Sequence, residues 1–169
     1  MKLIIHDLQK EEFHKLMPDI KKDTLIIGDD QSIHPCIGCF GCWLKTPGTC
    51  MIRSDAYGDM GYLISQCEKI TLISKCCYGG FSCFVKNVLD RSLPYLHPDF
   101  VIKNGEMHHR QRYQKELELN VHFYGEDITD QEKEIAKELL KANSINLYCS
   151  LNSVTFSISP YQIKGGSEI

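Results

Sequence analysis

Short apolar runs alternate with amphipathic segments along most of the chain. A brief, continuous apolar run predicts a strand that is buried on both faces, because such a strand has no polar side to expose. Runs of this kind lie at residues 2–5, 24–27 and 70–73. Two further strands are predicted at residues 117–124, where apolar and polar positions alternate, and at residues 153–158.

Helical spacing of apolar residues marks four other segments. They cover residues 9–17, 57–67, 81–93 and 129–141. Thr129 and Glu132 have the spacing of a capping box, which makes the last helix the clearest. Residues 94–114 are predicted to be irregular, and a loose tail is expected from Gly165. Strands alternating with helices predict one domain, residues 1–169, in which helices cover both faces of a parallel sheet.

Composition narrows the class of protein. The chain has 169 residues, of which 43% are hydrophobic and 24% charged, as in an ordinary globular domain. A net charge of -3 gives no basic surplus, so nucleic acid is not an expected partner. No apolar run approaches the roughly 20 residues that a membrane helix needs. Nine cysteines are expected to be reduced thiols or ligands, which favours a cytoplasmic location.

Four cysteines fall within a short segment: Cys36, Cys39, Cys42 and Cys50. The C-x2-C-x2-C spacing is typical of iron–sulfur ligands. A C-x2-C pair also suits redox-active thiols. Structural zinc more often takes two separated pairs of ligands. A fourth interpretation needs no metal, since a tight, glycine-rich loop favours small side chains whatever its chemistry. The sequence leaves these alternatives open.

The same segment carries a family resemblance. Residues Pro35–Trp43 and Pro47–Ile52 are similar to the cysteine segment of the flavodoxin-like NAD(P)H-dependent FMN reductases and their iron–sulfur flavoprotein relatives. Residues Tyr78–Arg91 resemble that family's loop and helix after the third strand. The resemblance covers most of residues 24–146. It implies an α/β, flavodoxin-like three-layer sandwich with a parallel sheet of order 2-1-3-4-5.

The resemblance also implies the ligands. FMN would lie at the carboxyl edge of the sheet, NAD(P)H would be the reductant, and a small molecule would be the redox substrate or electron acceptor. An iron–sulfur cluster would be held by Cys36, Cys39, Cys42 and Cys50. The residues expected to touch the flavin are Cys76, Cys77, Tyr78, Gly79, Gly80 and Ser82.

Two loops depart from the family pattern. The family's phosphate loop is rich in Gly, Ser and Thr, whereas residues His6–Glu12 contain none of these. They bring three carboxylates, from Asp7, Glu11 and Glu12, which Lys10 and His6 are expected to offset only in part. After the third strand, Lys75 stands where the family has proline, and Cys77 stands where an aromatic residue is common.

These observations predict an NAD(P)H-dependent flavin oxidoreductase of the FMN reductase type and leave FMN binding open. Two alternatives remain: a non-catalytic relative that has lost the flavin and acts as a binding or assembly partner, and an iron–sulfur electron-transfer protein. A homodimer is expected because two-fold dimers are the commonest oligomers. Its predicted surface combines the cysteine loop, flanked by Phe40 and Trp43, with residues 94–114.

Overall fold

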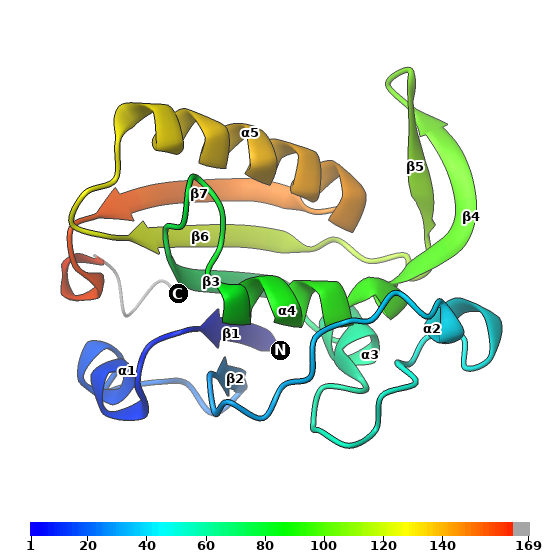
Figure 1. Ribbon diagram of the computed structural model, residues 1–169, viewed down its shortest axis with the longest axis horizontal. Helices are drawn as coiled ribbons and strands as arrows, with labels where there is room; N and C mark the ends of the chain where they lie inside the picture. The colour runs from blue at the N-terminus through cyan, green and yellow to red at the C-terminus, as the bar shows by residue number, and fades with distance from the viewer. Residues whose placement is uncertain (164–169) are drawn as a thin grey trace.

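A five-stranded parallel sheet forms the centre of the computed structural model, which describes residues 1–163 (Figure 1). The strands are β1 (Lys2–His6), β2 (Thr24–Gly28), β3 (Lys69–Lys75), β6 (Glu118–Tyr124) and β7 (Ser150–Ser157). Their order is β2-β1-β3-β6-β7, and every neighbouring pair is parallel. This order confirms the predicted flavodoxin-like arrangement. The expected tail from Gly165 lies outside the described residues.

The four predicted helices are present. They are α1 (Lys10–Leu16), α3 (Met60–Ser65), α4 (Cys83–Arg91) and α5 (Asp130–Leu147). Helix α5 continues beyond the predicted end at residue 141 and stops where Tyr148 adopts a left-handed conformation. A further short helix, α2 (Gly41–Leu44), lies in the cysteine loop. No helix within residues 1–163 is long and apolar enough to cross a membrane.

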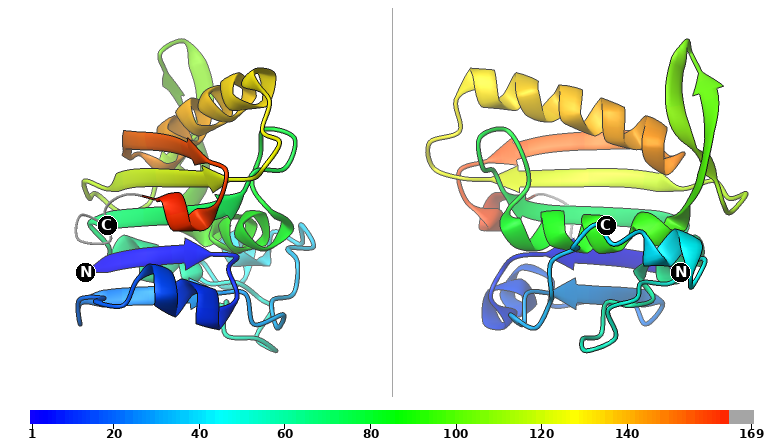
Figure 2. Two further views of the ribbon diagram at one scale, coloured as in Figure 1. Left: turned by 90° about the vertical axis from the view of Figure 1, so that its left-hand side faces the viewer. Right: turned by 45° about the vertical axis from the view of Figure 1, so that its right-hand side comes forward.

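Helices cover the two faces of the sheet unequally (Figure 2). Apolar side chains pack on both faces, in one large and one small core. Helices α3, α4 and α5 cover one face through a large core that includes Leu72 and Val121. Helix α1 packs Phe13 against Ile4 and Ile73 on the other face, and it is the one α-helix of the described residues in that smaller core. Helices therefore cover both faces of the sheet, as expected. On the second face, α1 covers mainly the half formed by β1 and β3.

Polar pairs occupy the β6–β7 half of that second face. His122 Nδ1 lies 2.6 Å from the Thr155 hydroxyl oxygen, and Ser153 donates a hydrogen bond of 2.8 Å to the Asn120 side-chain oxygen. These partners lie opposite each other in the β6–β7 register. Cross-strand hydrogen bonds thus satisfy buried polar groups there.

The prediction of an irregular segment at residues 94–114 is wrong. A short 3₁₀ turn, Leu93–Tyr95, leads into an antiparallel hairpin of β4 (Leu96–Lys103) and β5 (Glu106–Gln111). Its turn is Asn104–Gly105, and both residues have positive φ, as a tight two-residue hairpin turn requires. Pro98 is tolerated because the ladder is interrupted between Leu96 and Phe100. Figure 1 shows the hairpin beside the C-terminal end of α5.

Candidate functional site

Asp7 lies at the carboxyl edge of the sheet, directly after β1. One of its carboxylate oxygens accepts a hydrogen bond of 2.8 Å from the backbone N–H of Lys75, at the end of β3. The other accepts one of 2.9 Å from the hydroxyl of Tyr124, at the end of β6. The chain leaves β1 for β2 on one side while β3 lies on the other, so Asp7 occupies the switch point where ligands bind in open α/β sheets.

The start of α1 is also occupied by the chain's own side chains. The Glu12 carboxylate accepts a hydrogen bond of 3.2 Å from the backbone N–H of Gln9. A phosphate at this loop would have to displace Asp7 from the Lys75 N–H and would lie close to further negative charge. The residues of this loop therefore do not fit the phosphate group of FMN.

His6 does not offset that acidic charge. Its side chain is buried and stacks on Phe13, with 3.8 Å between the ring centroids. Gly28 leaves room for it, because a Cβ there would lie 2.7 Å from the imidazole. Burial lowers the pKa of His6 to about 4, so the ring is neutral at pH 7. The expectation that His6 would balance part of the acidic charge is wrong.

A cleft of about 450 Å³ opens at the carboxyl ends of β3, β6 and β7. Its lining residues are Lys75, Tyr124, Gly125, Glu126, Asp127, Ile158, Ser159 and Pro160. One lysine and two acidic residues make this lining slightly acidic. The volume is in the range of small-molecule and cofactor sites. Sequence reasoning missed this cleft because it draws on strand ends that are distant in the chain.

The loop predicted to touch a flavin folds tightly at the same edge. Backbone hydrogen bonds of 3.0 and 2.8 Å join Cys77 to Gly80, with Tyr78 and Gly79 at the turn. Gly79 packs against Ile135 of α5. The loop therefore leans toward α5, and the Tyr78 side chain is 92% exposed at its tip.

The other predicted flavin contacts flank that turn. Ser82 caps α4 by accepting a hydrogen bond from the Val85 N–H. Burial raises the pKa of the half-buried thiols of Cys76 and Cys77, which favours the neutral thiols. Lys75 lines the cleft, but none of the residues of the following loop, Cys76–Ser82, does. Its contact with a flavin remains a prediction.

The four clustered cysteines differ in exposure. Cys36 and Cys39 are exposed, whereas Cys42 and Cys50 are buried. Burial, with smaller contributions from the other three thiols, raises the pKa of Cys42 to about 11. Within the described part of the chain, no group of three or more His, Cys, Asp or Glu side chains is arranged to hold a metal ion. The structure therefore does not support the iron–sulfur or zinc interpretation.

A buried ion pair fixes the cysteine loop to α4. Arg91 donates hydrogen bonds of 2.6 and 2.9 Å to the two carboxylate oxygens of Asp55. The same guanidinium donates to the backbone carbonyls of His34 and Ile52. Burial alone would raise the pKa of Asp55, but the hydrogen bonds that it accepts from Arg91 and from the backbone N–H groups of His34 and Tyr57 outweigh burial and lower the pKa to about 2. The geometry makes this pair a structural clamp.

The two segments expected at a dimer surface lie together. Trp43 of α2 donates a hydrogen bond of 3.1 Å from its indole N–H to the Leu96 carbonyl at the start of the hairpin. The Trp43 ring lies 4.7 Å from the His109 ring, which lies 4.7 Å from the Phe100 ring. The cysteine loop and the hairpin thus form one continuous surface. The homodimer itself remains a prediction.

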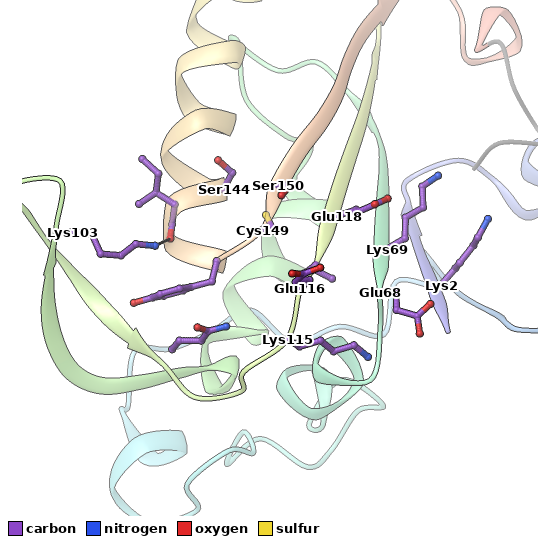
Figure 3. Close-up of a pocket in the computed structure, with 14 residues that line it drawn as sticks. Lys2, Glu68, Lys69, Lys103, Lys115, Glu116, Glu118, Ser144, Cys149 and Ser150 are labelled. Carbon is purple, nitrogen blue, oxygen red and sulfur yellow. Dashed lines mark hydrogen bonds between the residues drawn. The ribbon is translucent and has the colours of Figure 1, made fainter.

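A larger hollow, of about 920 Å³, lies at the opposite, amino edge of the sheet (Figure 3). The charges of its lining nearly cancel, because four lysines face three glutamates: Lys2, Lys69, Lys103 and Lys115, and Glu68, Glu116 and Glu118. Lys103 donates to the Ile145 carbonyl and lies 3.7 Å over the Tyr148 ring. We favour the smaller cleft because ligands of parallel α/β sheets bind at the carboxyl ends of the strands.

The fold is similar to those of two solved azoreductases and a solved quinone reductase. Azoreductase AzrA has a TM-score of 0.55 at 9% sequence identity, covering 92% of this chain and 86% of that chain. An FMN-dependent NADH-azoreductase from Bacillus anthracis, solved in complex with FMN, has a TM-score of 0.51 at 11% identity, covering 93% and 84%. An NADPH-quinone reductase from P. pentosaceus has a TM-score of 0.50 at 12% identity, covering 92% and 84%.

Identities this low show a shared fold and nothing finer. No family model matches the chain, and no curated protein matches it either.

Proposed function

We propose that the protein is an oxidoreductase related to the NAD(P)H-dependent flavin reductases, and that it holds an aromatic redox ring in the cleft at the carboxyl edge. The flavodoxin-like fold supports this, as do the FMN-dependent and quinone-reducing enzymes that share it. NAD(P)H would be the reductant and a small molecule the electron acceptor. A cytoplasmic location fits the chain's reduced cysteines.

The cleft itself carries the proposal. Tyr124, Ile158 and Pro160 give it apolar surface, and Gly125 adds no side chain to fill it. A concave site that combines apolar surface with a few polar groups is the usual form of a small-molecule site, and this cleft has both. The exposed ring of Tyr78, at the same edge, offers a further stacking surface.

Riboflavin titration tests the proposal, with binding measured by quenching of the flavin fluorescence. We expect saturable binding that Ile158→Asp weakens about tenfold or more, because the change replaces apolar cleft wall with a charge. Ile102→Asp is the matched control, since Ile102 is also a mostly exposed isoleucine, at 71% against 60% for Ile158, and lies on the distant hairpin. Absence of binding by riboflavin and by a quinone would contradict the proposal, as would equal effects of the two variants.

The second candidate is a non-catalytic relative that acts as a binding or assembly partner. The hydrogen bonds of Asp7 favour it, because they fill the position that a flavin phosphate would take. Oxidation of NADH and NADPH, followed at 340 nm with riboflavin and a quinone present, separates the candidates. The oxidoreductase predicts turnover that depends on the protein and is weakened by Ile158→Asp. The non-catalytic relative predicts none.

A further inference from the structure

We infer that the carboxyl edge selects ring ligands without a terminal phosphate, such as riboflavin or a quinone, and that Asp7 is the residue responsible. This inference rests on the proposed function, because it concerns the ligand of the same cleft. The acidic loop as a whole disfavours an anion, but the inference names one residue, Asp7, that determines which ligand binds.

The hydrogen-bond geometry is the first argument. The Lys75 N–H and the Tyr124 hydroxyl are hydrogen-bond donors at the switch point, where an anion of a ligand would find them. Asp7 accepts from both, at 2.8 and 2.9 Å, with a different oxygen for each. The backbone N–H of Asp7 in turn donates to the Ile73 carbonyl at 3.3 Å, which holds the residue against β3. The chain thus supplies its own anion where a ligand's anion would bind.

Charge is the second argument. The segment from the end of β1 to the first turn of α1 carries the carboxylates of Asp7 and Glu12, and the buried imidazole of His6 is neutral at pH 7. Burial and the neighbouring Asp7 carboxylate raise the pKa of Tyr124, so its hydroxyl keeps the proton that it donates to Asp7. Among residues 1–163, the cleft lining contains one cation, Lys75, and two acidic residues, Glu126 and Asp127. A phosphate dianion would therefore be repelled, whereas an uncharged ring would not.

The test compares riboflavin with FMN, which differ only by the phosphate, in fluorescence titrations of the same protein. We expect the wild type to bind riboflavin about tenfold or more tightly than FMN. The reason is that the two negative charges of the FMN phosphate would be repelled by the partly buried carboxylate of Asp7. Asp7→Asn keeps the shape and an acceptor for the Tyr124 hydroxyl but removes the charge, so it should bring the two affinities together. Asp127→Asn removes a charge from the same cleft, away from the switch point, and is the matched control.

The outcomes separate the two proposals. Equal or tighter binding of FMN by the wild type would overturn the inference while leaving the proposed function intact. An equal effect of Asp7→Asn and Asp127→Asn would show that net charge, and not Asp7, sets the preference, and would also overturn it. Failure of riboflavin, FMN and quinone alike to bind would end the proposed function and the inference together. The wild-type ratio decides the main claim even if Asp7→Asn does not fold.

Discussion

Arg91 and Asp55 form a bidentate ion pair in which both side chains are almost completely buried, with exposures of 0% and 1%. The pair joins the end of α4 to the loop that follows the cysteines. Further hydrogen bonds reach Asp55 from the backbone N–H groups of His34 and Tyr57, at 2.9 and 3.0 Å. The ion pair and these hydrogen bonds therefore hold the loop after the cysteines against α4.

Removal of one partner should be costly, because the other charge would stay buried without compensation. We predict that Arg91→Met lowers the free energy of unfolding by roughly 3–5 kcal/mol, measured by urea denaturation. Arg53→Met breaks the exposed Arg53–Asp59 pair, whose side chains are 52% and 54% exposed, and should cost less than about 1 kcal/mol. Similar losses in the two variants would contradict the clamp.

His6 predicts a pH dependence of stability. Its pKa is lowered to about 4 in the folded protein, against 6.5 for an ordinary histidine, so the unfolded chain binds more protons between these values. The stability contributed by neutral His6 is fully present above pH 6.5 and is lost as the pH falls toward 4. At pH 5 the free energy of unfolding should be lower by about 2 kcal/mol from this cause.

The measurement is urea denaturation at pH 5 and pH 8. His6→Phe should remove this part of the pH dependence, whereas His14→Gln, on the exposed side of α1, should change it only slightly, because His14 is a minor cause of the lowered His6 pKa. A His6→Phe protein that loses as much stability as the wild type between the two pH values would refute the assignment.

The cysteines should differ sharply in reactivity. We predict rapid alkylation by N-ethylmaleimide at the exposed Cys36, Cys39 and Cys83, and modification of the buried Cys42, Cys50 and Cys67 only after unfolding. Peptide mapping by mass spectrometry identifies each site. If Cys36 and Cys39 were protected until a chelator was added, a bound metal would be shown and the metal-free account of this loop would fail.

Gly79 shapes the loop after β3. It has a φ of +78°, and an added Cβ would lie 2.8 Å from Ile135 and 2.9 Å from the Glu132 carbonyl. Gly79→Ala should therefore destabilise the protein by about 1–3 kcal/mol. Gly80→Ala is the control, because its nearest neighbour would be at 3.4 Å, and it should cost under about 1 kcal/mol. Thermal or urea unfolding that ranks the two variants in the opposite order would be inconsistent with this loop geometry.

The five strands of the main sheet and the four main helices were predictable because buried strands and amphipathic helices have distinct periodicities. The strand order came from the family resemblance, since periodicity does not tell which strands are neighbours. The hairpin β4–β5 was missed because β5 is largely polar and β4 contains Pro98, so neither shows the alternation that marks a strand. The acidic loop after β1 was visible in the sequence. The bonds from Asp7 to Lys75 and Tyr124 were not, since they join residues 68 and 117 positions apart.

Amide chemical-shift mapping with ¹⁵N-labelled protein and riboflavin tests the location of the site most directly. We predict that the largest shifts fall on Lys75 and on residues 124–127 and 158–159, around the carboxyl-edge cleft. The amides of residues 144–150, beside the larger hollow at the amino edge, should not move. Shifts concentrated at residues 144–150, or none at saturating ligand, would contradict the account.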